Sequence, residues 1–376
     1  MVRIVVAGDY CPIYRVAEQL NKGDYSFFDG VKGIVEKSDY ALVNLECPVV
    51  DTDAKPIKKC GPNLRTISKV VDSICYGGFS GVTLANNHFR DFGDEGCNTT
   101  INELKRQNID FVGGGCNLVQ AQAILYKNIS SKTFAIINFC ENEFSIATDS
   151  RAGSAPIDLV DNYKQIQEAR ANADYVLLIV HGGHEFYQLP SPRMKKLYRH
   201  FVDLGVDVVV NHHQHCYSGY EYYKGKPIVY GVGNFCFDSY RNRDSIWNEG
   251  YMVNITFDSD INIELIPYQQ CNHSSSIDLL DAENAENFKQ RIAELNEVIA
   301  NDTLLLEKFN EFAETKRRDV MRLFASYHNR YLNAAAARSI IPYPLRKGES
   351  EAIENYVTCE SHIDVVHRII SSLNNE

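Results

Sequence analysis

The stretch GVDVVVNHHQHCYSGYEYYKGKPIVYGVGNF, residues 205–235, places three histidines directly behind a run of valines. A short, continuous apolar run is typical of a strand that is covered on both faces, as in layered α/β proteins. In open α/β sheets, ligands bind beyond the carboxyl ends of such strands. The positions of His212, His213 and His215 therefore predict a site at the end of a buried strand.

The same pattern recurs through the first 270 residues. Apolar runs that end abruptly in polar residues alternate with amphipathic stretches, of which 96–108 and 191–205 are the clearest predicted helices. The apolar runs are RIVVAGD (3–9), DYALVNLE (39–46), GVTLANNH (81–88), KTFAIINF (132–139), DYVLLIVHGGHE (174–185) and VDVVVNHHQH (206–215). This alternation predicts a layered α/β domain over residues 1–270.

The sequence pattern changes from about residue 278. Residues 285–324 contain neither Gly nor Pro and repeat apolar residues at helical spacing. The stretch IPYPLRKGES (341–350) interrupts this pattern, and CESHIDVVHRIISSL (359–373) resumes it. We expect a helical C-terminal appendage over 278–376, which would be a small domain, a lid or an element that docks a protein partner.

Composition narrows the class of protein. The formal net charge of −11 argues against a nucleic-acid partner, because such a protein needs a basic face. The 11 cysteines stand no closer together than Cys47 and Cys60, which favours a reducing compartment. The start, MVRIVVAGDY, lacks a signal-peptide layout, and no apolar run approaches the roughly 20 residues that span a bilayer. We therefore expect a cytoplasmic chain with no membrane span.

The polar residues that close the apolar runs belong to one chemical class. They are Asp9, Asn44, Glu46, Asn86, Asn87, His88, His181, His184, Glu185, His212, His213 and His215. Asp, Glu, Asn and His suit one or two divalent ions such as Mn, Fe or Zn, and Glu46 or Asp9 could bridge two of them. Each residue alone has a structural explanation, such as a turn or a helix cap. Their recurrence at five strand ends favours a metal site over a metal-free polar pocket.

The motifs, taken in order, resemble a known family. GD, NLE, ANNHxxDFG, HGGHE, HHQH and KGKPIVYGVGNFCFD are similar to the motifs of the CapA family of capsule and poly-γ-glutamate biosynthesis proteins. The domain of that family is similar to calcineurin-like metallophosphoesterases. The resemblance, which covers about residues 2–260, implies an α/β/β/α-type metallophosphoesterase-like sandwich followed by the helical appendage.

Carried over residue by residue, the resemblance implies a site. The metal ligands would be Asp9, Glu46, Asn87, His181, His213 and His215. Glu46 would bridge two metals, His88 would be the acid that faces the leaving group, and Asp91 would orient His88. Substrate contacts would involve Glu185, His212 and Asn234, with Arg65 on the preceding loop.

The chain also departs from the family pattern. Ordinary metallophosphoesterases begin Asp-x-His, but here the string is Asp9-Tyr10-Cys11, so one ligand of the first metal is missing. Gly182 stands where CapA-like proteins commonly have Trp. Lys58, Lys59 and Arg65 lie on the loop before the Asn-Asn-His motif, where they meet an anionic substrate or, as we expect, remain solvated.

Two functions fit this pattern. The first is a metal-dependent hydrolase, in which activated water attacks a phosphoester or an amide of an anionic polymer or of a small phosphorylated or γ-glutamyl substrate. The second is a non-catalytic accessory protein of a surface-polymer assembly, with the C-terminal helices docking a partner. The nearly complete ligand set favours the hydrolase, and the missing histidine favours the accessory protein.

Overall fold

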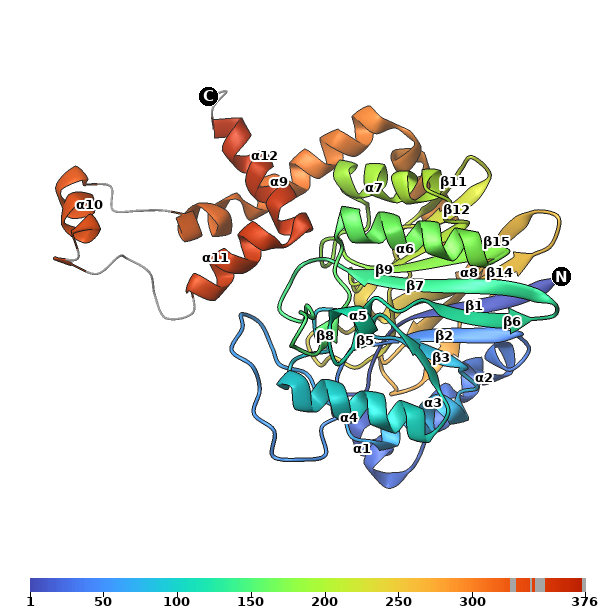
Figure 1. The fold of residues 1–376 in the computed structure, drawn as a ribbon. Helices are drawn as coiled ribbons and strands as arrows, with labels where there is room; N and C mark the ends of the chain where they lie inside the picture. Colours follow the sequence, from blue (N-terminus) through green and yellow to red (C-terminus); the bar gives the residue numbers. More distant parts are fainter. Residues whose placement is uncertain (325–328, 339, 342–348, 374–376) are drawn as a thin grey trace.

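Two β-sheets pack face to face, and helices cover the outer face of each sheet (Figure 1). The computed structural model describes residues 1–324, 329–338, 340–341 and 349–373. Within these ranges the chain forms the expected α/β/β/α sandwich, followed by C-terminal helices.

The first sheet has the strand order β16-β15-β14-β1-β2-β3-β4, and β13 also pairs with β1. The pairs β1–β2, β2–β3, β3–β4 and β1–β13 are parallel, so the carboxyl ends of these strands meet at one edge. The strands are β1 (Val2–Cys11), β2 (Tyr40–Leu45), β3 (Gly81–Thr83), β4 (Asp110–Val112), β13 (Asn234–Phe237), β14 (Glu249–Phe257), β15 (Ile261–Gln270) and β16 (Ile277–Leu279).

The second sheet has the order β11-β12-β10-β9-β7-β6, and its central pairs β7–β9, β9–β10 and β10–β12 are parallel. Its strands are β6 (Leu125–Ile129), β7 (Lys132–Cys140), β9 (Tyr175–His181), β10 (Val208–His212), β11 (Tyr220–Tyr223) and β12 (Lys226–Val229). A short pair, β5 (Gly114–Gly115) and β8 (Gly153–Ser154), lies apart from both sheets.

Three apolar layers hold the sandwich together. Val6 and Leu42 from the first sheet meet Ile136, Ile179 and Val210 from the second in the central layer. The strands read as continuous apolar runs because their other faces are buried as well. Those faces pack on α1 (Tyr14–Lys22), α2 (Asp29–Val35), α3 (Lys69–Tyr76) and α4 (Gly93–Arg106) on one side, and on α6 (Leu159–Asn172) and α7 (Pro192–Asp203) on the other.

The region after residue 278 is helical in its described parts. It contains α8 (Ala282–Ala300), α9 (Asp302–Phe324), α10 (Arg330–Ala337), α11 (Glu349–Thr358) and α12 (Glu360–Leu373). One further short helix, α5 (Leu118–Ala121), belongs to the sandwich region. Phe288 and Ile292 of α8 join the central apolar layer. Because α8 packs into the sandwich, the predicted division into a domain over 1–270 and an appendage over 278–376 stays a prediction.

The more distal helices form a separate apolar cluster. Phe309, Ala313 and Val320 of α9 pack with Val365 and Ile369 of α12. The expected break at 341–350 falls mostly on residues 342–348, which lie outside the described residues. Within the described ranges, no helix is both long enough and apolar enough to cross a membrane.

Candidate metal centre

The carboxyl ends of the parallel strands from both sheets bring five buried ligand-type side chains together. Asp9 lies near the end of β1, Glu46 follows β2, His181 ends β9, and His213 and His215 follow β10. Each is at most 5% exposed. Their assembly follows from topology, because strands of the two sheets that are distant in sequence end at a common edge.

The carboxylate of Glu46 lies at the middle of this group. Its Oε1 is 3.8 Å from His181 Nε2 and 3.6 Å from His215 Nε2. Neither carboxylate oxygen has a hydrogen-bond partner among the described residues, although both are buried. Burial and the charges of Asp9 and Glu185 raise the pKa of Glu46 well above its ordinary value. A buried carboxylate without donors is costly, and a cation would satisfy it.

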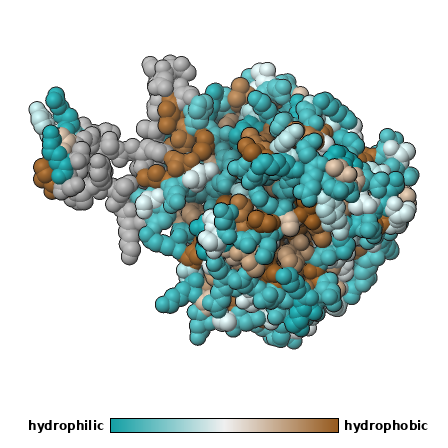
Figure 2. Space-filling view, in the orientation of Figure 1, coloured by the Kyte–Doolittle hydropathy of each residue, from teal (hydrophilic) through white to brown (hydrophobic). Residues whose placement is uncertain are grey.

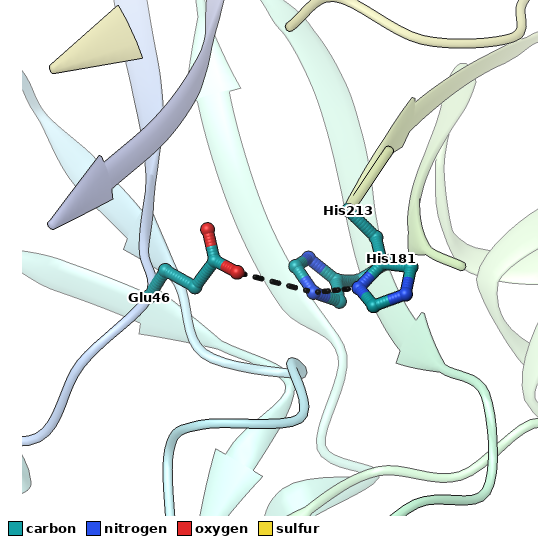
Figure 3. Close-up of side chains that lie close together, drawn as sticks. All are labelled: Glu46, His181 and His213. Atoms are coloured by element: carbon teal, nitrogen blue, oxygen red, sulfur yellow. Dashed lines mark hydrogen bonds and ion pairs between the residues drawn. The ribbon is translucent and has the colours of Figure 1, made fainter. Parts of the chain in front are cut away.

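Two sets of ligand atoms share Glu46. One consists of Glu46, His181 and His213, which Figure 3 shows pointing toward one another, and the other consists of Asp9, Glu46 and His215. Within each set, the ligand atoms lie within 4.8 Å of one another. Carboxylate oxygen and imidazole nitrogen suit a divalent ion such as Mn, Fe or Zn. The donor set therefore fits a divalent cation.

Neighbouring polar groups orient the ligands. His215 Nδ1 lies 2.9 Å from the amide oxygen of Asn234, which can only accept, so Nδ1 carries the proton and Nε2 is left with a lone pair. Asn44 donates to Asp9 Oδ1 at 2.8 Å. Hydrogen bonds of this kind fix ring tautomer and direction around metals. A side chain at Gly8 would lie 1.9 Å from the carbonyl oxygen of Gly233, so only glycine lets β13 bring Asn234 beside Asp9.

The set formed by Glu46, His181 and His213 has short contacts of its own. His181 Nε2 lies 3.1 Å from both the amide oxygen of Asn87 and His213 Nδ1. His213 Nε2, on the other side of its ring, lies 3.7 Å from Glu143 Oε1. Asn87 thus lies beside His181, and its role as a metal ligand stays a prediction. Burial, followed by the neighbouring imidazoles, lowers the pKa of His181 well below its ordinary value, so its nitrogens are free of the second proton.

The backbone after β10 is held in an unusual conformation. His213 has φ of 92° and His215 has φ of 54°, a region that residues with a side chain rarely adopt. Such conformations persist where the surrounding structure imposes them, and they cluster at functional sites. Here they direct both imidazoles toward Glu46.

His88 and Asp91 form a pair beside the metal-type ligands. His88 Nδ1 lies 2.7 Å from Asp91 Oδ2, so Nδ1 donates to the carboxylate and Nε2 remains available. Lys59 contacts the same carboxylate through Oδ1 and lies 3.1 Å from His88 Nδ1. The expectation that Lys59 is solvated is wrong: its side chain is 2% exposed, because the loop folds back over the site.

The sequence of the sandwich matches a family model. Residues 3–239 match the bacterial capsule synthesis protein PGA_cap. The chain belongs to this capsule synthesis family. It is 34% identical over 253 residues to the capsule biosynthesis protein CapA of Bacillus anthracis, a match that covers 64% of this chain and 62% of that protein.

Two further relatives carry related names. The PGA biosynthesis protein CapA of Bacillus subtilis (strain 168) is 34% identical over 248 residues, which cover 64% of each chain. A probable polyglutamine synthesis accessory protein of Mycobacterium tuberculosis is 26% identical over 216 residues, which cover 52% of this chain and 55% of that one. The chain thus spans less than two thirds of the length of these capsule synthesis relatives.

Solved structures are similar at a lower level. A 5'-nucleotidase from Candida albicans SC5314 matches with a TM-score of 0.43 and 11% identity, over 84% of this chain and 58% of that chain. A hypothetical protein from Thermus thermophilus matches with a TM-score of 0.46 and 12% identity, over 71% of this chain and 99% of that chain. Similarity at this level says nothing about what a capsule synthesis protein binds.

The other predicted substrate contacts occupy different places. Glu185 is exposed, and Asn234 is the partner of His215. His212 Nε2 lies 3.0 Å from the carbonyl oxygen of Ala7, between the two sheets. Arg65 is exposed, lies over the ring of Phe92 at 5.6 Å and lines a separate open groove of about 770 Å³. The roles of all four stay predictions.

The departures from the family pattern have structural counterparts. Cys11, at the position of the missing histidine, lies in the apolar layer between the first sheet and its helices. A side chain at Gly182, where relatives were expected to carry Trp, would lie 2.7 Å from Cγ of Glu141, which occupies that space. This capsule synthesis chain has thus placed a carboxylate where an indole was expected.

Sequence reasoning missed two acidic residues that close β7. Burial and the charges of Glu185 and Glu141 raise the pKa of Glu143 to about 8. Burial opposes ionisation of Glu141, but Arg193 and a hydrogen bond from Ser361 outweigh it and lower the pKa of Glu141 to about 2. A signal was present, since Glu141 and Glu143 follow an apolar run as the other site residues do.

Glu141 also belongs to a third group with Cys359 and Glu360 of the C-terminal region. Arg193 donates to Glu141 Oε1 at 2.7 Å, and the Ser361 hydroxyl donates to the same oxygen at 2.8 Å. The backbone N–H of Ser361 donates to Oε2 at 3.3 Å. Because these donors already satisfy the carboxylate, this group is a junction between β7, α7 and α12 and not a metal site.

Proposed function

We propose that this chain is a metal-dependent hydrolase that cleaves a phosphoester or amide bond in the biosynthesis of a surface polymer. The observation that carries the proposal is the Glu46 carboxylate, which is buried without a donor between two sets of imidazole and carboxylate ligands. Membership of the capsule synthesis family supports the polymer context.

The proposed ligands are Asp9, Glu46, Asn87, His181, His213 and His215. A divalent cation held by them would polarise an ester or amide oxygen and make water more acidic. We propose that the cation is Mn, Fe or Zn and that one or two such ions bind. Because Cys11 takes the place of a histidine, the position at Asp9 and His215 would bind more weakly than the position at His181 and His213.

The protein's own groups supply proton transfer and positioning. We assign His88 as the acid in its doubly protonated form: Asp91 accepts the proton on Nδ1, and the second proton, on Nε2, would pass to the leaving oxygen or nitrogen. Lys59 shares the Asp91 carboxylate and so fixes the His88–Asp91 pair from the other side. Asp91 and Lys59 are positioning residues in this scheme.

The alternative is a non-catalytic accessory protein of the polymer assembly. The replacement of the expected histidine by Cys11, buried in the apolar layer, favours it. The Mycobacterium tuberculosis relative is named as a probable polyglutamine synthesis accessory protein, which points the same way. In this alternative the metal would serve structure, and the C-terminal helices would dock a partner.

The deciding experiment is metal analysis by mass spectrometry on protein purified without added metal or chelator. We expect one or two Mn, Fe or Zn ions per chain and their loss in His213→Ala. The control is His200→Ala, an exposed histidine on α7, which should keep the metal. Absence of metal from the wild type even after reconstitution would contradict the hydrolase and leave the accessory protein.

The substrate is proposed by class only: an anionic polymer, or a small phosphorylated or γ-glutamyl compound. With a net charge of −11, the chain would attract a polyanion only through a locally positive site, which bound cations would provide. A panel of phosphoesters and γ-glutamyl amides, assayed with the metal-loaded protein, tests the class. The cytoplasmic location stays a prediction that cell fractionation would test.

A further inference from the structure

A cavity lies between the loop after β9 and the C-terminal helices. Its volume is about 210 Å³. His184 and Glu185 line it from the loop, and Lys316 of α9, Tyr356 of α11 and His362 of α12 line it from the C-terminal region. At about 30 Å³ per water, it could hold about seven waters or a small organic group.

Two ring nitrogens in the wall of this cavity are buried and unpartnered. His184 Nε2 and His362 Nδ1 have no hydrogen-bond partner among the described residues, and His184 is only 5% exposed. Burial lowers the pKa of His184 to about 3 and lowers that of His362, so both rings are neutral. A neutral imidazole nitrogen donates or accepts one hydrogen bond. Both residues line the same cavity, so a polar ligand bound there could satisfy the two nitrogens.

The charged groups around the cavity define that ligand further. Glu185 and Asp319 supply carboxylates to its wall, and Lys316 is a cation that lies 5.4 Å from the ring of Phe312. Burial opposes ionisation of Glu185, but the nearby His215, His213 and His88 outweigh it and lower its pKa. The wall thus carries both carboxylates and an ammonium group, and a small ligand with one positive and one negative group could contact both kinds.

We propose that this cavity binds the α-amino acid group of a ligand. The ammonium lies against Glu185 and Asp319, and the carboxylate lies against Lys316. His184 and His362 complete the hydrogen bonding of the same group. An ammonium alone would leave Lys316 uncompensated, and a carboxylate alone would face two like charges.

This inference rests on the proposed function and deepens it. Glu185 lines the cavity and its charge also acts on His213 and His215, so a group bound here lies next to the metal centre. The cavity would hold the terminal amino acid unit of an amide substrate. It also assigns a role to the C-terminal helices, which supply one wall of the binding site.

The C-terminal wall is firmly attached to the sandwich. Arg193 of α7 donates to Asp364 of α12 at 2.8 Å and to Glu141 at 2.7 Å, and Asn142 donates to Glu360 at 2.8 Å. Figure 2 shows hydrophobic side chains gathered where these helices join the body. These hydrogen bonds hold α12, which carries His362, against the sandwich.

The test is isothermal titration of the full chain with L-glutamate, in the presence of chelator so that no metal can bind the ligand. Glutarate lacks the amino group and 4-aminobutyrate lacks the α-carboxylate. We expect L-glutamate to bind, and each analogue to bind at least tenfold more weakly. Equal binding of glutarate or of 4-aminobutyrate would overturn the zwitterionic assignment.

Variants locate the binding. Lys316→Met and His362→Ala should each weaken L-glutamate at least tenfold, whereas Lys308→Met, on the same helix and paired with Glu311, should not. Val365→Phe, which fills the cavity, should abolish binding while circular dichroism and the unfolding midpoint confirm a folded chain. Failure of wild-type protein to bind millimolar L-glutamate, or binding unchanged in these variants, would overturn the proposal.

Failure of this proposal is distinguishable from failure of the hydrolase. His213→Ala should lose metal and still bind L-glutamate, within a fewfold of the wild-type affinity, because the cavity does not include that ring although its charge acts on Glu185. A wild-type protein that binds metal but not L-glutamate would overturn the cavity proposal and leave the metal centre standing. A wild-type protein that binds L-glutamate but never metal would overturn the hydrolase proposal and leave the cavity proposal standing.

Discussion

Lys59 and Asp91 form an ion pair in which both side chains are almost completely buried, at 2% and 0% exposure. Asp91 is also held by His88 and by the backbone N–H of Leu64, which donates to Oδ2 at 2.6 Å. The neighbouring Lys58 points outward, with its side chain 76% exposed, and pairs with Glu351 of α11. One loop therefore contacts both the His88–Asp91 pair and the C-terminal helices.

Replacing Lys59 by Met should destabilise the fold, because it leaves a buried carboxylate without its cation. Breaking a buried pair costs roughly 3–5 kcal/mol, and we expect the lower end because His88 and Leu64 still donate to Asp91. Urea denaturation measures the change in the free energy of unfolding. Lys58→Met is the matched control and should have little effect, since its pair is solvated. Equal stability of the two variants would contradict the role of Lys59.

Replacing Glu46 by Gln should affect metal binding and apo-protein stability in opposite directions. The amide removes the negative charge that would attract a cation, so we expect metal affinity to fall at least tenfold. In chelator, the same change removes an acid buried without donors, so the unfolding midpoint should rise. Mass spectrometry and thermal unfolding in chelator measure the two effects. A lower midpoint in chelator would show that Glu46 has partners we have not identified.

Replacing His88 by Ala should separate catalysis from metal binding. His88 is assigned as the acid and is outside the proposed ligand set, so metal content should stay near the wild-type level. General acid catalysis contributes about 10²- to 10⁴-fold, and turnover should fall by that factor on any substrate found for the wild type. Simultaneous loss of metal would place His88 among the ligands and refute its assignment as the acid.

The Glu141–Arg193 junction predicts acid sensitivity. The folded pKa of Glu141 is lowered from 4.5 to about 2, so its contribution is present above pH 4.5 and is lost as the pH falls toward 2. The shift corresponds to roughly 3 kcal/mol. Urea denaturation between pH 7 and pH 2.5 should show a steeper loss of stability in the wild type than in Glu141→Gln. Parallel pH profiles would contradict this contribution.

Much of the site was predictable from one rule, that polar residues closing apolar runs meet at a sheet edge. Asp9, Glu46, His181, His213 and His215 each follow such a run, and the structure brings them together. The rule works because parallel strands fix where their carboxyl ends lie, independently of the loops between them. The α/β/β/α layering was predictable for the same reason, since strands buried on both faces read as continuous apolar runs.

The loops were less predictable because their positions depend on contacts that are distant in sequence. Nothing near Lys59 indicates that it packs against residue 91, and solvation is the ordinary fate of a loop lysine. The cavity between His184 and His362 depends on helices that return to the sandwich after more than 100 residues. Glu143 is different, because the rule of strand ends applies to it and was not extended to β7.

The positive φ angles of His213 and His215 have an evolutionary consequence. Such a conformation costs of order 1–3 kcal/mol for a residue with a side chain, and glycine adopts it freely. Selection for stability alone would therefore replace these histidines early. A directed-evolution library screened only for thermal resistance should accumulate Gly or Asn at 213 and 215. A screen for function should keep histidine there and find its stabilising substitutions elsewhere.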